Sequence, residues 1–175
     1  MSFEPRNESL KMDFALAVSG GKLDIVKNIL AAHPDAAAWD DVMGGTALRK
    51  AVAHGSPDLE TVRFLVEQGS DIDAQDKDGL TPLMFAAMHG ESGVIQLLLE
   101  KDAKTEPTDK AGRTAAQIAY DCGHTETALA LVAHDQHKRE MAEAKRLKDL
   151  HDEAAQAHSG LDHAVYVNKP LVMRP

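Results

Sequence analysis

Short apolar runs alternate with polar turns along most of this chain, and the alternation recurs at a nearly constant spacing. The clearest copy begins with TPLMFAAMHG at residues 81–90 and continues with ESGVIQLLL at residues 91–99. In each half the apolar residues fall at helical spacing, and Gly90 separates the two halves. The pattern therefore predicts two short amphipathic helices joined at this glycine.

When the chain is aligned with itself, the residues of this pattern recur at equivalent positions, here called columns, elsewhere in the chain. A shift of 35 residues back places Thr46 under Thr81, a shift of 33 forward places Thr114 there, and a shift of 69 back places Gly21 under Gly90. Four copies predict a stacked array, because a single unit of this size cannot bury its own apolar stripe. The predicted organisation is a lead-in at residues 1–9, followed by units at about 10–40, 41–75, 76–108 and 109–133.

Local signals mark several ends of the predicted helices. Thr46 is expected to cap the helix that follows it with its hydroxyl, which can accept a hydrogen bond from a free backbone N–H. Pro34 is expected to stop the preceding helix, since proline disfavours helical geometry in the residue before it. Gly69 is expected to end a helix in the left-handed conformation.

The period is lost after residue 133. Residues 134–158 are rich in charges, lack glycine and proline, and carry a thin apolar stripe, which predicts a long C-terminal helix. Ser159 and Gly160 are expected to end that helix, and residues 159–175 are predicted to form an extended tail.

The repeated columns resemble the ankyrin repeat family, in which Gly-x-Thr-Pro-Leu-His-x-Ala-Ala opens each unit. Residues 79–83, 86–87, 90 and 94–99 match the motif closely, and the resemblance covers about residues 10–133. The implied fold is all-α: an ankyrin-repeat solenoid of helix-turn-helix units with hairpin-like loops, followed by the long helix and the tail. The family's histidine is replaced here by Arg49, Met84 and Gln117.

The resemblance also implies a function, because ankyrin repeats bind proteins through the tips of their hairpins and the exposed face of their first helices. The chain is therefore expected to be a non-enzymatic protein-binding module or adaptor. Carried over position by position, the expected partner-binding residues are Trp39, Asp40, Val42, Met43, His54, Gln75, Lys77, Asp78, Leu80, Met88, His89, Lys110, Arg113 and Asp121. Trp39 has two interpretations: an exposed apolar anchor beside Val42 and Met43, or a side chain folded back over the first unit.

Charge and composition narrow the class of partner. The 175 residues carry a net charge of −9, and residues 1–133, with 12 Lys and Arg against 21 Asp and Glu, hold that excess. An acidic array repels phosphate backbones, so we expect acidic hairpin tips to meet a basic protein and expect no nucleic acid partner. The single cysteine, Cys122, fits a reducing compartment, and no apolar segment approaches bilayer length. We expect a cytoplasmic protein that does not bind membranes.

No familiar catalytic or cofactor motif is present in the sequence, so no enzymatic activity, cofactor or metal is expected. Two alternatives stay open. The C-terminal helix and tail can dock on the repeats, giving self-inhibition or a tail-mediated homodimer in place of a monomer. The spacing of His134 with His137, and of His151 with His158, also permits metal binding or catalysis, although a solvated helix surface explains that spacing more simply.

Overall fold

The structure, a computed structural model, describes residues 5–39, 46–53 and 57–162 and contains no strand among them. The chain divides into two compact units, residues 1–133 and residues 134–175. The predicted residues Asp40, Val42, Met43 and His54, and the tail after residue 162, lie outside the described residues.

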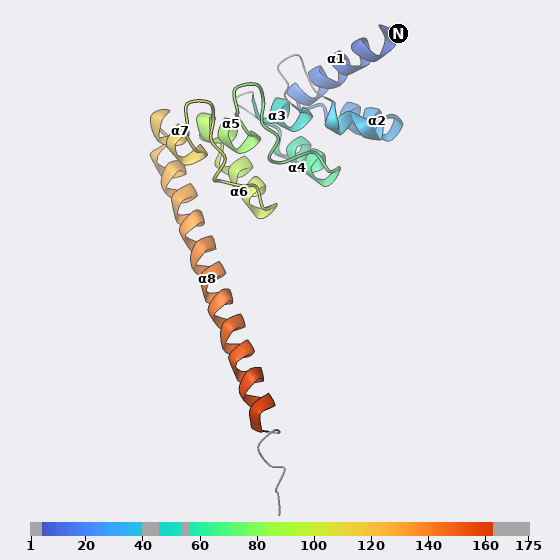
Figure 1. The fold of residues 1–175 in the computed structure, drawn as a ribbon. Coiled ribbons are helices and arrows are strands. Elements are labelled where there is room, and N and C mark those ends of the chain that lie inside the picture. Colours follow the sequence, from blue (N-terminus) through green and yellow to red (C-terminus); the bar gives the residue numbers. More distant parts are fainter. Residues whose placement is uncertain (1–4, 40–45, 54–56, 163–175) are drawn as a thin grey trace, which may run out of the picture. The chain divides into compact units, whose positions relative to one another are not determined.

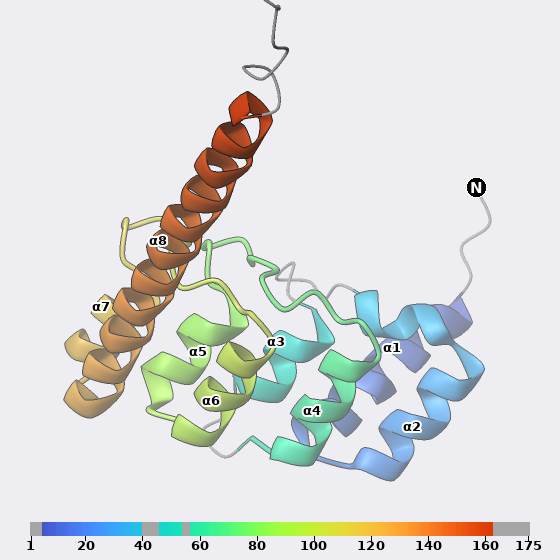
Figure 2. The same cartoon turned by 90° about the horizontal axis from the view of Figure 1, so that it is seen from below.

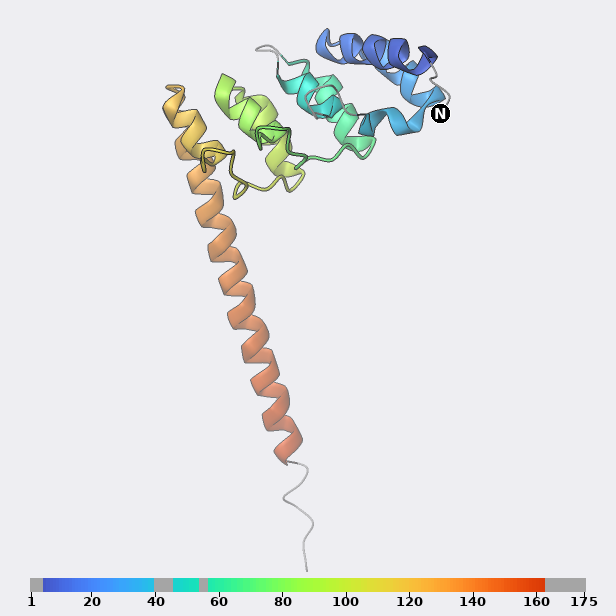
Figure 3. The same ribbon diagram turned by 45° about the horizontal axis from the view of Figure 1, so that its top comes forward.

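The first unit is a stack of helix pairs, as the repeated columns predict (Figure 1). The first helix of each pair packs on the first helix of the next pair, and the second helices of the first three pairs form a parallel row. Two further views show the same two rows (Figures 2 and 3). The first helices are α1 (Pro5–Ser19), α3 (Ala47–Val52), α5 (Pro82–His89) and α7 (Ala115–Asp121). The second helices are α2 (Leu23–Ala32), α4 (Leu59–Glu67), α6 (Ser92–Glu100) and the start of α8 (Thr125–Asp162), and a 3-10 turn, η1 (Pro34–Ala38), follows α2. The all-α solenoid is therefore confirmed.

The core lies between the helix pairs and is built from the repeated apolar columns. Leu48 and Leu83 occupy one column, and both are almost completely buried. Ala51, Ala86 and Ala119 occupy another column, where a small side chain lets neighbouring first helices approach closely. Each fully buried leucine contributes about 1.5–3 kcal/mol relative to an exposed one. No single centre holds the array together, and each unit depends on its neighbours.

Two of the three threonines at this repeated position cap the helix that follows them, but not Thr46, the one for which a cap was expected. Thr81 Oγ1 accepts a hydrogen bond from Met84 N at 3.3 Å, and Thr114 Oγ1 accepts one from Gln117 N at 3.4 Å. The side chains in the family's histidine column reciprocate, since Met84 Sδ and Gln117 Oε1 accept from the threonine N–H groups at 3.5 and 2.9 Å. The expectation for Thr46 is wrong: it precedes α3, but its buried hydroxyl makes no capping bond.

Two predicted helix boundaries are also wrong. The first helix begins at Pro5 rather than near residue 10, because proline is tolerated in the first turn of a helix, where its missing N–H is not needed. The second helix of the fourth unit and the predicted C-terminal helix are one continuous helix, α8, which passes through Ser159 and Gly160 to Asp162. One glycine costs a helix only about 1 kcal/mol, too little to end a long one. None of the described helices combines the length and apolar character needed to cross a bilayer.

Candidate protein-binding surface

The hairpin that precedes α5 is held by one carboxylate. Asp76 Oδ1 accepts hydrogen bonds from Asp78 N and Leu80 N, each at 2.9 Å. The backbone closes the same turn, with Asp76 N donating to Leu80 O at 3.0 Å and Gly79 N donating to Asp76 O at 3.0 Å. The tip therefore has a fixed backbone, from which the side chains of Lys77 and Asp78 extend into solvent.

The hairpin that precedes α7 repeats this arrangement and adds an ion pair. Asp109 Oδ1 accepts from Ala111 N at 2.9 Å and Arg113 N at 2.8 Å. Its Oδ2 accepts from Arg113 Nε at 3.0 Å and Nη2 at 2.8 Å. The backbone N–H of Arg113, followed by its guanidinium, holds the pKa of Asp109 below the ordinary value of 3.8, although burial opposes this shift. Arg113 Nη1 also lies 3.5 Å from Asp121 Oδ2, so the hairpin is tied to the end of α7.

The two hairpins are joined to each other through backbone and side-chain bonds. Lys110 N donates to Asp78 O at 3.0 Å. Gln75 Nε2 donates to Gly79 O at 2.9 Å and to Thr108 O at 3.1 Å, so this predicted partner-binding side chain is used inside the array. Lys110 Nζ lies 3.8 Å from Asp78 Oδ1, but both side chains are more than 70% exposed, and such a pair is weak in water.

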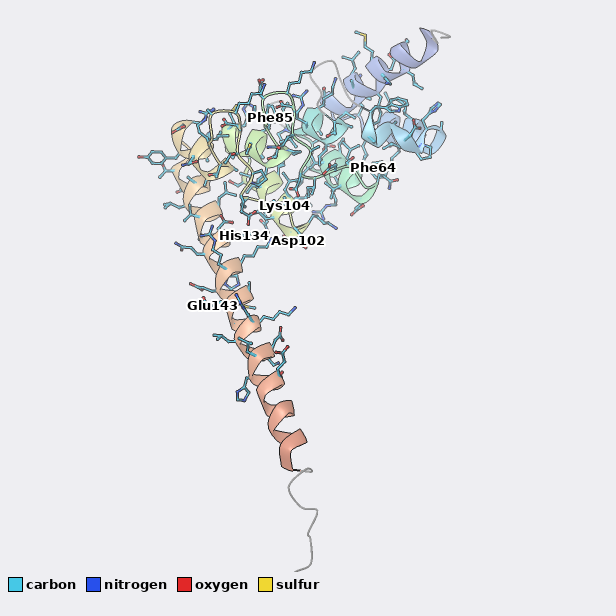
Figure 4. All side chains as sticks on the ribbon, viewed as in Figure 1. Phe64, Phe85, Asp102, Lys104, His134 and Glu143 are labelled. Carbon is cyan, nitrogen blue, oxygen red and sulfur yellow. The ribbon has the colours of Figure 1, made fainter. Side chains whose placement is uncertain are left out.

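The first helices beside the hairpins contribute a partly apolar surface. Phe85, labelled in Figure 4, is half-buried. The centroid of its ring lies 5.4 Å from the guanidinium carbon of Arg49 on the preceding unit, a cation–aromatic contact. Met88 and Leu80 are also half-buried against the core, whereas His89 is exposed. Phe85 was not among the predicted site residues, although it lies three positions before Met88 on the same helix.

His124, which directly precedes α8, fixes the end of α5. Its Nε2 lies 3.1 Å from Met88 O, and a carbonyl oxygen only accepts, so the imidazole nitrogen is the donor. Gly90 adopts the left-handed conformation at φ +68 beside the same ring. His124 thus has a structural role between α5 and α8, and the nearby Cys122 side chain is exposed.

Trp39 folds back over the first unit, the second of its two interpretations. Its ring packs edge-on against Phe14 with centroids 5.9 Å apart, and its Nε1 donates to Asp35 Oδ2 at 2.8 Å. Lys11 Nζ lies 5.9 Å from the ring centroid. The Trp39 ring and its Nε1 are thus engaged by other residues of the first unit. A part for Trp39 in partner binding stays a prediction.

The acidic charge is unevenly distributed between the two sides of the array. The second helices α4 and α6 with their loops, at residues 57–73 and 91–106, carry nine Asp and Glu against three Lys and Arg. The first helices α3, α5 and α7 with the two described hairpins, at residues 47–52, 74–89 and 107–121, carry four acidic and five basic residues, and the sequence adds Asp40 and Asp41 in the segment that is not described. In Figure 4, Asp102 and Lys104 mark the second-helix side and Phe85 the first-helix side. The hairpin before α5 carries Asp76 and Asp78 against Lys77, and the hairpin before α7 carries Asp109 against Lys110 and Arg113, so the expectation of acidic hairpin tips stays a prediction.

Among the described residues there is no group of three or more His, Cys, Asp or Glu side chains arranged to hold a metal ion. His134, His137 and His151 lie on α8, and His158 lies where side chains are not described. The docking of the C-terminal helix and tail on the repeats stays a prediction, as does metal binding through the tail.

Comparison with known proteins places the repeats in a family. A family model described as "Ankyrin repeats (3 copies)" matches residues 56–142. Protein glp-1 of Caenorhabditis elegans is 34% identical over 147 residues, which are 81% of this chain and 10% of that protein. Ankyrin repeat domain-containing protein 63 of Mus musculus is 33% identical over 115 residues, covering 63% of this chain and 29% of that protein. Protein phosphatase 1 regulatory subunit 12A of Mus musculus is 37% identical over 76 residues, covering 43% of this chain and 7% of that protein. The chain thus spans less than a third of each of these relatives, and its repeated helix pairs show that it belongs to the ankyrin repeat family.

Proposed function

We propose that this chain is a non-enzymatic protein-binding module or adaptor that contacts its partner through the hairpin tips and the concave face formed by its first helices. The observation that carries the proposal is the pair of hairpins fixed by Asp76 and Asp109. Each carboxylate holds two backbone N–H groups, and the bond from Lys110 N to Asp78 O joins the tips. Loops that are already ordered lose little conformational entropy on binding, which favours affinity.

The surface beside these hairpins offers the side-chain types that concentrate binding energy in interfaces. Phe85 and Met88 are half-buried, so each can bury further apolar area against a partner without leaving its present packing. The Arg49 guanidinium lies over Phe85, and aromatic and arginine side chains are enriched among interface residues whose truncation is costly. Lys77, His89 and Lys110 supply an exposed polar rim.

The charge distribution refines the proposed partner. The hairpin side is close to neutral, so binding there depends on shape and apolar contact more than on net charge. The second-helix side, with its excess of acidic residues, attracts a basic region of the same partner at long range and raises the rate of encounter. This attraction weakens as salt is added, because the Debye length falls to about 8 Å at physiological ionic strength.

Two charge swaps that leave the net charge unchanged separate the two sides. One variant exchanges the hairpin charges, Lys77→Glu with Asp78→Lys, and the control exchanges exposed charges on α4, Glu60→Lys with Arg63→Glu. A partner is captured with the wild-type chain, identified, and titrated with each variant. The hairpin swap is expected to weaken binding by about tenfold, about 1.4 kcal/mol, and the α4 swap by less than about threefold. The opposite order would place the binding surface on the second helices.

A further inference from the structure

Beyond the repeats, α8 carries a regular row of positions on one face. Gln136, Glu140, Glu143, Leu147 and Leu150 follow one another at steps of four, three, four and three residues, which keeps them on a single stripe of the helix, here called the α8 seam. The same steps continue in the sequence at Ala154, Ala157 and Leu161, all within α8. This spacing is the heptad spacing of helices that pair side by side.

The seam is exposed where it can be described. Leu147 is 61% and Leu150 is 54% exposed. Ala142, Glu143, Arg146, Leu147 and Leu150 adjoin one another on this exposed stretch of the helix, and Figure 4 shows Glu143 projecting from α8. Burying exposed apolar side chains lowers the free energy, so a second helix that covers both leucines is favoured to lie along this stripe.

The charges on the seam indicate which kind of helix fits. Two copies of α8 paired in parallel and in register bring Glu140 against Glu140 and Glu143 against Glu143, and an antiparallel pair centred between them brings Glu140 against Glu143. Other antiparallel registers set one of these carboxylates against an uncharged side chain of the second copy. Each arrangement leaves acidic groups that face no basic residue of the seam itself, since Arg139 and Arg146 lie beside the seam and not in it, and this opposes self-pairing. A basic residue on another helix removes the conflict.

We propose that the α8 seam binds a helical segment of a different protein, with Lys or Arg facing Glu140 and Glu143 and leucines facing Leu147 and Leu150. Arg139 and Arg146 flank the seam at positions that select acidic residues at the edges of the same segment. The seam shares no residue with the hairpins or the first helices, so it gives the chain a second attachment point. The inference does not depend on the function proposed for the repeats.

Two synthetic helices of about three heptads test the proposal on the full chain. Both peptides carry leucines placed to pack against Leu147 and Leu150. One peptide has lysines opposite Glu140 and Glu143, and the other has glutamates at the same positions. In fluorescence anisotropy titrations at low salt, the lysine peptide is expected to bind at least about tenfold more tightly. The Glu140→Lys, Glu143→Lys variant is expected to reverse this preference. The control Asp149→Lys, Asp152→Lys makes the same change in net charge off the seam and is expected to keep the wild-type preference.

Equal affinities for the two peptides, or no binding of the lysine peptide, would overturn the proposal. Light scattering coupled to gel filtration tests the rival occupant, a second copy of the chain. The mass of the wild-type protein is expected to match that of the Leu147→Lys, Leu150→Lys variant. A wild-type mass about twice that of this variant would show that a second copy occupies the seam. Circular dichroism of every variant checks that α8 stays helical, so that a loss of binding can be assigned to the seam.

Discussion

Replacing Gly90 with alanine is expected to destabilise the array through two effects that can be separated. The first is backbone strain, because Gly90 has φ +68, and a left-handed conformation costs a residue with a Cβ about 1–2 kcal/mol. The second is steric. A Cβ on Gly90 lies 2.5 Å from His124 Nδ1 and 2.9 Å from its Cγ, so the imidazole has to move. Its bond to Met88 O, worth about 1 kcal/mol, is then lost.

Gly69 provides the matched control for the backbone effect. It is also left-handed, at φ +84, but a Cβ there meets nothing within 4 Å. The free energy of unfolding from urea denaturation is therefore expected to fall by about 1–2 kcal/mol in Gly69→Ala and by about 2–4 kcal/mol in Gly90→Ala. The difference between the two variants measures the contact with His124.

A double-mutant cycle assigns that difference to one side chain. In a His124→Ala background the imidazole is gone, and Gly90→Ala is expected to cost only the backbone strain, as Gly69→Ala does. Equal losses for Gly69→Ala and Gly90→Ala in the wild-type background would refute the reasoning, since the steric effect would then be absent. A Gly90→Ala loss that persists unchanged without His124 would refute it as well.

Two further substitutions test the hairpins and the loops. Asp109 has a pKa below its ordinary value in the folded chain, so it contributes stability above about pH 4 that is lost as the pH falls through the folded pKa. Asp109→Asn is therefore expected to be less stable than wild type at pH 7, and the difference in stability is expected to shrink in acid. A difference in urea midpoints that stays constant from pH 7 to pH 2 would contradict this. Asp102 is left-handed at φ 61, in the column that holds Gly69 in the preceding unit. Asp102→Gly is expected to raise the melting temperature by relieving about 0.5–1 kcal/mol of strain, and a lower melting temperature would show that the carboxylate contributes more than the strain costs.

The stack of helix pairs could be predicted from the sequence because its information is repeated. Leu48 and Leu83, or Thr81 and Thr114, are the same position of one unit, and each copy confirms the reading of the others. The errors fell at positions that depart from the repeated pattern or lie outside it. Thr46 resembles its equivalents but lacks a capping bond, and Gly160 resembled a helix stop although one glycine is a small cost within the 38 residues of α8.

The candidate surface was less predictable, because it depends on which groups meet across units. Gln75 was expected on the partner-binding surface, yet its side-chain amide donates hydrogen bonds that link two hairpins. Asp109 was not among the predicted site residues, and its bonds to Arg113 appear once the hairpin is folded. The acidic net charge is a property of the whole chain, and its concentration on the second helices follows only when each residue is assigned to a helix. His124 could be found only through its contact with Gly90 and Met88, more than 30 residues earlier.

The central claim is that the hairpins and first helices form the partner-binding surface, and amide chemical-shift mapping tests it most directly. The full ¹⁵N-labelled chain is titrated with the captured partner, and each perturbed amide is assigned to one side of the array. The account predicts the largest perturbations at residues 74–80, 85–89 and 107–113. Perturbations confined to residues 57–73 and 91–106, on the second helices and their loops, would contradict it.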